Sequence, residues 1–133
     1  MRSVVLRLAA GFFVFLSLVA SLSCGQDHKL VAITVKPDGF TFSNAAGGET
    51  VQYTATGEFV HPPETRDITL QVVWSSPTPD VIAVNAKGLG TVAGVACGTN
   101  IPVTATASTN LRLPPSGNIV IGSATVNVKL VGC

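Results

Sequence analysis

The chain has 133 residues, of which 47% are hydrophobic and 11% are charged, and its formal net charge is +1. Once an N-terminal export segment is removed, this length accommodates one small domain and excludes a second. The charged residues form no basic cluster, which argues against nucleic-acid binding.

The N-terminal segment, residues 1–23, has the features of a secretory signal. Arg2 and Arg7 precede the almost wholly apolar stretch Leu8–Val19, which is too short for a comfortable membrane span of about 20 residues. Its removal leaves six basic and seven acidic residues, so the net charge of the mature chain becomes −1. The expected organisation is a signal peptide over residues 1–23, a tether over residues 24–30 and one domain over residues 31–133.

The residues that follow the apolar stretch resemble the lipobox of bacterial lipoproteins. Ser23 directly precedes Cys24, as in that family, although Ser21 stands where the family prefers leucine. The resemblance implies that the Cys24 thiol receives a diacylglycerol, so that lipid holds the mature protein at a membrane. Gly25 after the cysteine implies the outer rather than the inner membrane of a cell envelope. The alternatives are ordinary signal cleavage with a leftover thiol, or an uncleaved anchor.

Short alternating segments separated by turn residues follow the tether. Alternation of apolar and polar residues is typical of strands with one buried face, and no segment after the signal shows a helical period. The clearest strand is Ile68–Ser75, whose alternate residues from Ile68 to Trp74 share an apolar face. We expect loops at Gly57–Asp67 and Asn110–Gly122, each of which contains a Pro-Pro pair. The other expected strands are Val31–Lys36, Phe40–Ser43, Glu49–Thr56, Val81–Val84, Thr91–Val95, Ile101–Ala107 and Ala124–Leu130.

Six short motifs in this order resemble the bacterial Ig-like domain of group 2, found in invasin- and intimin-like adhesins. The closest motif is Gly48–Thr56, with the sequence GETVQYTAT against GETVQLTAT in the family, so Tyr53 replaces a leucine. The resemblance implies an all-β fold, an Ig-like β-sandwich of two antiparallel sheets with seven to eight strands. It places Trp74 in the core between the sheets. The other motifs are Ala32–Pro37, Val73–Ser76, Asp80–Val84, Lys87–Val95 and Val103–Ala107.

Cys97 and Cys133 remain as an even pair in a chain that we expect to be exported, where disulfides persist. One precedes the strand that starts near Ile101 and the other follows the last strand, so a hairpin of these strands would bring the two cysteines together. The apolar faces of that hairpin match best with Val103 opposite Val126 or Val128, which requires a one-residue bulge at Gly98, Gly122 or Gly132. Metal binding and free thiols are the alternatives, which the absence of a C-x-x-C motif disfavours.

The titratable residues suggest no catalytic constellation. Glu58, Glu64 and Asp67 lie near His61 and could in principle hold a cation, but their loose spacing favours solvated surface charge. The sequence has no G-x-S-x-G elbow and no glycine-rich loop that opens a helix. We therefore expect no enzyme, no cofactor and no metal.

The sequence favours an envelope lipoprotein whose one domain acts as a binding or adhesion module through loops or a sheet edge. The expected partners are the membrane, through the lipid, and a protein or glycan of the envelope. A carbohydrate-binding module and a purely structural envelope protein are the alternatives. Apolar residues within the expected loops are candidate contacts, unless they pack on their own domain: Phe59, Val60, Leu111, Leu113, Ile119 and Val120.

Overall fold

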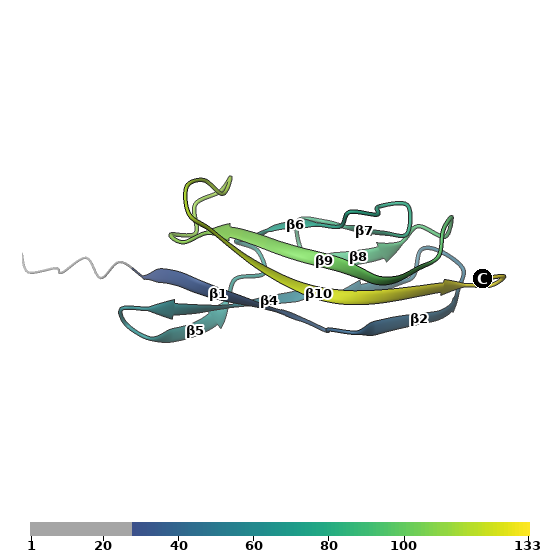
Figure 1. Cartoon of the computed structure of the whole chain (residues 1–133), viewed down its shortest axis with the longest axis horizontal. Coiled ribbons are helices and arrows are strands. Elements are labelled where there is room, and N and C mark those ends of the chain that lie inside the picture. The colour runs from purple at the N-terminus through teal and green to yellow at the C-terminus, as the bar shows by residue number, and fades with distance from the viewer. Residues whose placement is uncertain (1–27) are drawn as a thin grey trace, which may run out of the picture.

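The computed structural model describes residues 28–133, so the expected signal peptide and Cys24 lie outside the described residues. Within this range the chain forms ten β-strands and no helix, which confirms the all-β class. The expected seven to eight strands in two antiparallel sheets are wrong in number and pairing, because the strands form three sheets and β2 pairs with β10 in parallel orientation. Figure 1 shows most strands running along the long axis of the molecule. The strands are β1 Lys29–Lys36, β2 Phe40–Ala45, β3 Thr50–Gln52, β4 Thr54–Val60, β5 Glu64–Asp67, β6 Val73–Ser75, β7 Ile82–Val84, β8 Leu89–Val92, β9 Gly98–Ser108 and β10 Ile119–Leu130.

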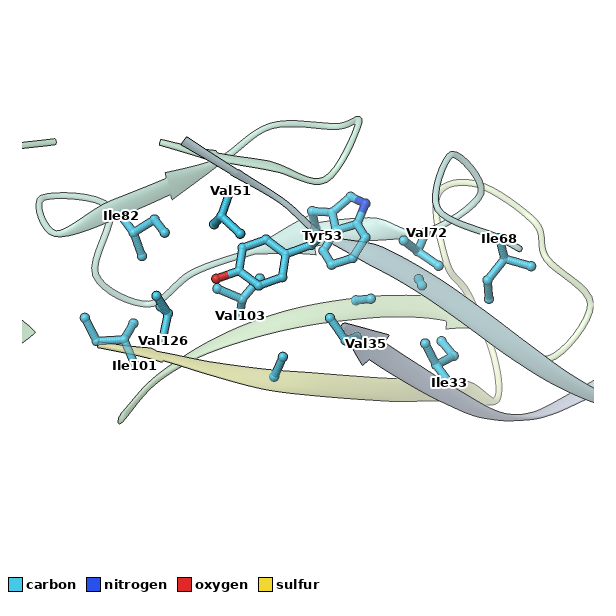
Figure 2. Close-up of a cluster of buried hydrophobic side chains, with 14 of the residues drawn as sticks. Ile33, Val35, Val51, Tyr53, Ile68, Val72, Ile82, Ile101, Val103 and Val126 are labelled. Atoms are coloured by element: carbon cyan, nitrogen blue, oxygen red, sulfur yellow. The ribbon is translucent and has the colours of Figure 1, made fainter. Parts of the chain in front are cut away.

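The strands form one four-stranded sheet, in the order β2-β10-β9-β6, and two three-stranded sheets, in the orders β1-β4-β5 and β3-β8-β7. Only Tyr53 separates β3 from β4, so the two smaller sheets are joined along one strand path. Figure 2 shows side chains of the smaller sheets, such as Val51 and Tyr53, facing Val103 and Val126 of the large sheet. All four residues belong to one buried apolar cluster, as the alternation in their strands predicts.

The first two strands belong to different sheets. β1 pairs with β4 in antiparallel orientation, whereas β2 pairs with β10 in parallel orientation. Asp38, at the corner between them, accepts hydrogen bonds from Thr125 of β10 through its backbone N–H (2.7 Å) and its hydroxyl (2.9 Å). These hydrogen bonds hold the pKa of the Asp38 carboxyl below its usual value. The corner therefore directs the chain from one sheet to the other.

β1 and β10 approach each other closely at Gly122. A Cβ added at Gly122 would overlap the carbonyl oxygen of Ile33 in β1, so only glycine allows this contact. β1 also begins at Lys29, two residues inside the expected tether, and Leu30 is completely buried. The folded domain therefore begins before the expected boundary at residue 31.

The β9–β10 hairpin has the expected side-chain faces but a different register. Ala124 lies opposite Val103 and Val126 lies opposite Ile101, whereas Val103 was expected opposite Val126 or Val128. The bulge falls on β9 between Gly98 and Ile101, because Val128 lies opposite Gly98. It therefore lies beside the first of the three glycines considered for it. The disulfide joins Cys97 to Cys133 with their Cα atoms 6.6 Å apart, as expected.

Two expected loops contain strands. Residues 57–67 form most of a hairpin of β4 and β5, with His61 to Pro63 in the turn. Every residue of β5 is exposed, and a strand without a buried face shows no apolar alternation from which it could be predicted. Similarly, β10 begins at Ile119, inside the expected connection Asn110–Gly122.

The expected strand Ile68–Ser75 is wrong over its first half, because residues 68–71 form a turn and β6 begins only at Val73. Val72 and Trp74 are buried, but Leu70 is 70% exposed, so it does not share their face as expected. The turn closes by a hydrogen bond from the N–H of Gln71 to the carbonyl of Ile68 (2.8 Å). The turn satisfies a backbone N–H and a backbone carbonyl that would otherwise form hydrogen bonds with a neighbouring strand.

Candidate functional site

The six candidate contact residues occupy different environments. Phe59 is buried, with the guanidinium carbon of Arg66 4.4 Å from the centre of its ring. Val60 is half-buried, and Leu111 and Val120 are partly buried against the core. Leu113 and Ile119 are the two that are exposed. The structure therefore leaves only these two free to make an apolar contact outside the domain.

Sequence reasoning missed other exposed apolar side chains. On the outer face of the large sheet, Val73 and Ile121 both lie opposite Thr106, and both are exposed. The exposure of Ile121 could have been predicted, because side chains alternate between the two faces of a strand and Ile121 falls on the face opposite to that of the buried Ala124 and Val126. Val73 alternates with the buried Val72 and Trp74, so it lies on the opposite, exposed face of its strand.

A hollow of about 430 Å³ lies where the turn at residues 68–71 meets the junction of β3 and β4. The sequence did not predict it, because it exists only where the chain turns at residue 68 instead of continuing as a strand. The exposed Leu70 lies on its wall among polar side chains. The lining residues are Gln52, Thr54, Asp67, Thr69, Leu70, Gln71 and Lys87.

Hydrogen bonds through Thr69 hold the turn beside the hollow. The Thr69 hydroxyl accepts a hydrogen bond from the backbone N–H of Ala55 (2.9 Å), and its carbonyl accepts one from the indole N–H of Trp74 (2.9 Å). The Trp74 ring is buried, and its centre lies 6.3 Å from that of Tyr53. Because both partners of Thr69 belong to the core, the hollow has a preformed wall.

The charges at the hollow are of opposite sign. Asp67 accepts a hydrogen bond from the N–H of Thr69 (2.8 Å), and the hydrogen bonds from Thr69 hold the pKa of the Asp67 carboxyl below its usual value. Gln52 donates from its side-chain amide to the carbonyls of Tyr53 (2.7 Å) and Lys87 (2.8 Å). An exposed leucine flanked by a carboxylate, amides and an ammonium group suits contact with a protein segment of mixed polarity.

The aromatic side chains provide little surface for stacking against a sugar ring. Within residues 28–133, Phe42, Tyr53, Phe59 and Trp74 are buried, and Phe40, 37% exposed, packs edge-on against Phe42. The described residues contain no group of three or more histidine, cysteine or acidic side chains that could hold a metal ion. Glu58, Glu64 and Asp67 lie along the β4–β5 hairpin, and Glu64 Oε2 lies 3.3 Å from His28 Nδ1.

No protein-family model matches the chain, and no curated protein matches it. In the part of the chain that the structure describes, no helix is long and apolar enough to cross a membrane.

Proposed function

We propose that the chain is a lipid-anchored envelope protein whose single Ig-like domain acts as a non-catalytic binding module. The strand order supports the Ig-like part of this proposal, and the lipobox-like residues around Cys24 support the anchor. The order β2-β10-β9-β6 supports an Ig-type large sheet with an additional N-terminal strand, and the succession β1, β4/β3, β8, β7 supports the opposite Ig-type sheet. The burial of Trp74 on β6 supports the same proposal, because Ig-type sandwiches bury a strand tryptophan between their sheets. The disulfide supports an oxidising, exported environment.

Replacement of Cys24 by serine is expected to release the mature protein from the membrane fraction. The variant lacks the thiol that would carry the diacylglycerol, and acyl chains are what would hold the domain at the bilayer. Fractionation of cells and the intact mass of the mature protein measure the effect. The matched control is the double variant C97S/C133S, which loses two cysteines and is expected to remain membrane-bound. Equal membrane retention of C24S and the parent protein contradicts lipid anchoring when the intact mass of C24S shows that residues 1–23 have been removed; a retained C24S that still carries these residues is held by its uncleaved signal segment.

The hollow is the surface that we assign to the protein partner. Leu70 provides an exposed apolar contact on a preformed wall, and Lys87 lies beside it with a reactive amine. Cross-linking with an amine-reactive reagent in the native envelope is expected to join a stoichiometric partner to Lys87 and not to Lys129, which lies on the other sheet. The variant L70D is expected to lose this product, whereas V95D, altered at another exposed apolar side chain, is expected to keep it.

Cross-linking, together with a glycan array, distinguishes the proposed protein contact from the alternative functions. Cross-links at Lys129 with none at Lys87 would move the binding surface to the large sheet. The absence of any partner would favour a purely structural role in the envelope. Binding to a glycan array would favour the carbohydrate-binding alternative, for which the buried aromatic residues provide little support.

A further inference from the structure

The described chain begins at the end of the domain where the β9–β10 loop lies. The N–H of Leu30 donates a hydrogen bond to the carbonyl of Thr109 at the end of β9 (2.7 Å). His28 contacts Glu64 of β5 at 3.3 Å. Figure 1 shows the start of β1 and the β9–β10 loop at one end of the molecule and the C-terminus at the other. Any anchor attached before residue 28 is therefore attached at the end that carries this loop.

The β9–β10 loop and the start of β10 expose apolar side chains at this end. Leu113 is 52% exposed and Ile119 is 51% exposed. Arg112 lies beside Leu113, and the chain contains no acidic residue after Asp80. Arg112 is the only charged residue of the loop itself, residues 109–118, while the acidic Glu64 at the same end is paired with His28. An exposed apolar loop with a basic residue suits the interface of a bilayer, where apolar side chains enter the headgroup region and arginine meets anionic lipid.

The covalent length of the tether brings this surface to the membrane. Three residues lie between Cys24 and His28, and the four Cα–Cα steps of so short a chain span no more than about 15 Å. We propose that the β9–β10 loop, through Leu113 and Ile119, rests on the same bilayer that holds the Cys24 lipid; this inference rests on the lipid anchoring proposed above. The opposite end of the domain, which carries the Cys97–Cys133 disulfide, then faces away from the membrane. The twelve residues of β10 separate the two ends by about 35 Å.

Tryptophan fluorescence in vesicles with brominated acyl chains tests this orientation. Trp74 is the only native tryptophan, and it is buried, so the lipidated parent protein provides the baseline. The variants L113W and S116W place a probe in the β9–β10 loop. V95W is the matched control, because Val95 is 74% exposed and lies two residues before the disulfide-bonded Cys97. Each lipidated variant is reconstituted into vesicles of phosphatidylglycerol and phosphatidylethanolamine, with and without bromine.

The expected result is a blue shift and bromine quenching of the added emission in L113W and S116W, with neither effect in V95W. Equal emission of all three variants in brominated and unbrominated vesicles overturns the proposed orientation, and so does quenching of V95W. Flotation of the same samples separates the two proposals. Protein that floats with the vesicles without quenching contradicts the orientation alone, whereas protein that does not float contradicts the anchor as well. Unchanged thermal unfolding of the variants shows that the probes leave the fold intact.

Discussion

Replacing both Cys97 and Cys133 with serine is expected to lower the free energy of unfolding by about 4 kcal/mol. The disulfide closes a loop with a sequence separation of 36 residues, which restricts the unfolded chain. It also holds residues 131–133, which follow β10 and are all exposed. Two hydrogen bonds accompany the bridge: the N–H of Leu130 donates to the Cys97 sulfur (3.4 Å), and the N–H of Cys133 donates to the carbonyl of Leu130 (3.2 Å).

Urea denaturation of the oxidised parent, the reduced parent and C97S/C133S measures this loss. The reduced parent and the double variant are expected to unfold at the same urea concentration, because both lack only the cross-link. A loss below about 1 kcal/mol would show that the β9–β10 pairing alone holds this end of the domain. Trp74, buried in the core, reports unfolding by its fluorescence in all three samples.

The second large effect is expected at alkaline pH, where Tyr53 should destabilise the fold. Its side chain is completely buried, and its hydroxyl lacks a hydrogen-bond partner. Burial raises the pKa of Tyr53 from its ordinary value of about 10 to about 12. Below pH 10 the phenol is neutral in both states, so stability is unaffected. Between pH 10 and 12 only the unfolded chain ionises, so the free energy of unfolding falls by up to about 3 kcal/mol.

The variant Y53F isolates this contribution. It keeps the ring in the core and removes the unpaired hydroxyl, so it is expected to be at least as stable as the parent at neutral pH. It should also lose less stability than the parent between pH 10 and 12. Tyr53 is the only tyrosine, so phenolate absorbance in the near ultraviolet follows its ionisation directly. Ionisation near pH 10 with the domain still folded would contradict the assigned burial.

The alternation of residues predicted those strands that have one buried face. The alternating faces of β9 and β10 appear in the structure, because each packs one side on the core and the other toward solvent. In β1 the alternation holds from Ile33 to Val35 but not at Val31, which is exposed because an irregularity between Leu30 and Ala32 shifts the strand and buries Leu30 instead. The same reasoning failed for β5, which is exposed throughout, and for residues 68–71, where a local turn replaces the expected strand. The hollow beside Leu70 depends on that turn, so the sequence could not locate it.

The amino-acid sequence by itself determined the all-β class, the pairing of Cys97 with Cys133 and the alternating faces of the longest strands. The fold class and the strand faces follow from the alternation of apolar and polar side chains, and the disulfide follows from the chemistry of an even pair of cysteines. Only the tertiary structure decided the register of the β9–β10 hairpin, the burial of Phe59 and the exposure of Leu70. It also decided that the chain enters the domain beside the β9–β10 loop. These features arise from contacts between distant segments, whose hydrogen bonds and packing outweigh the local pattern.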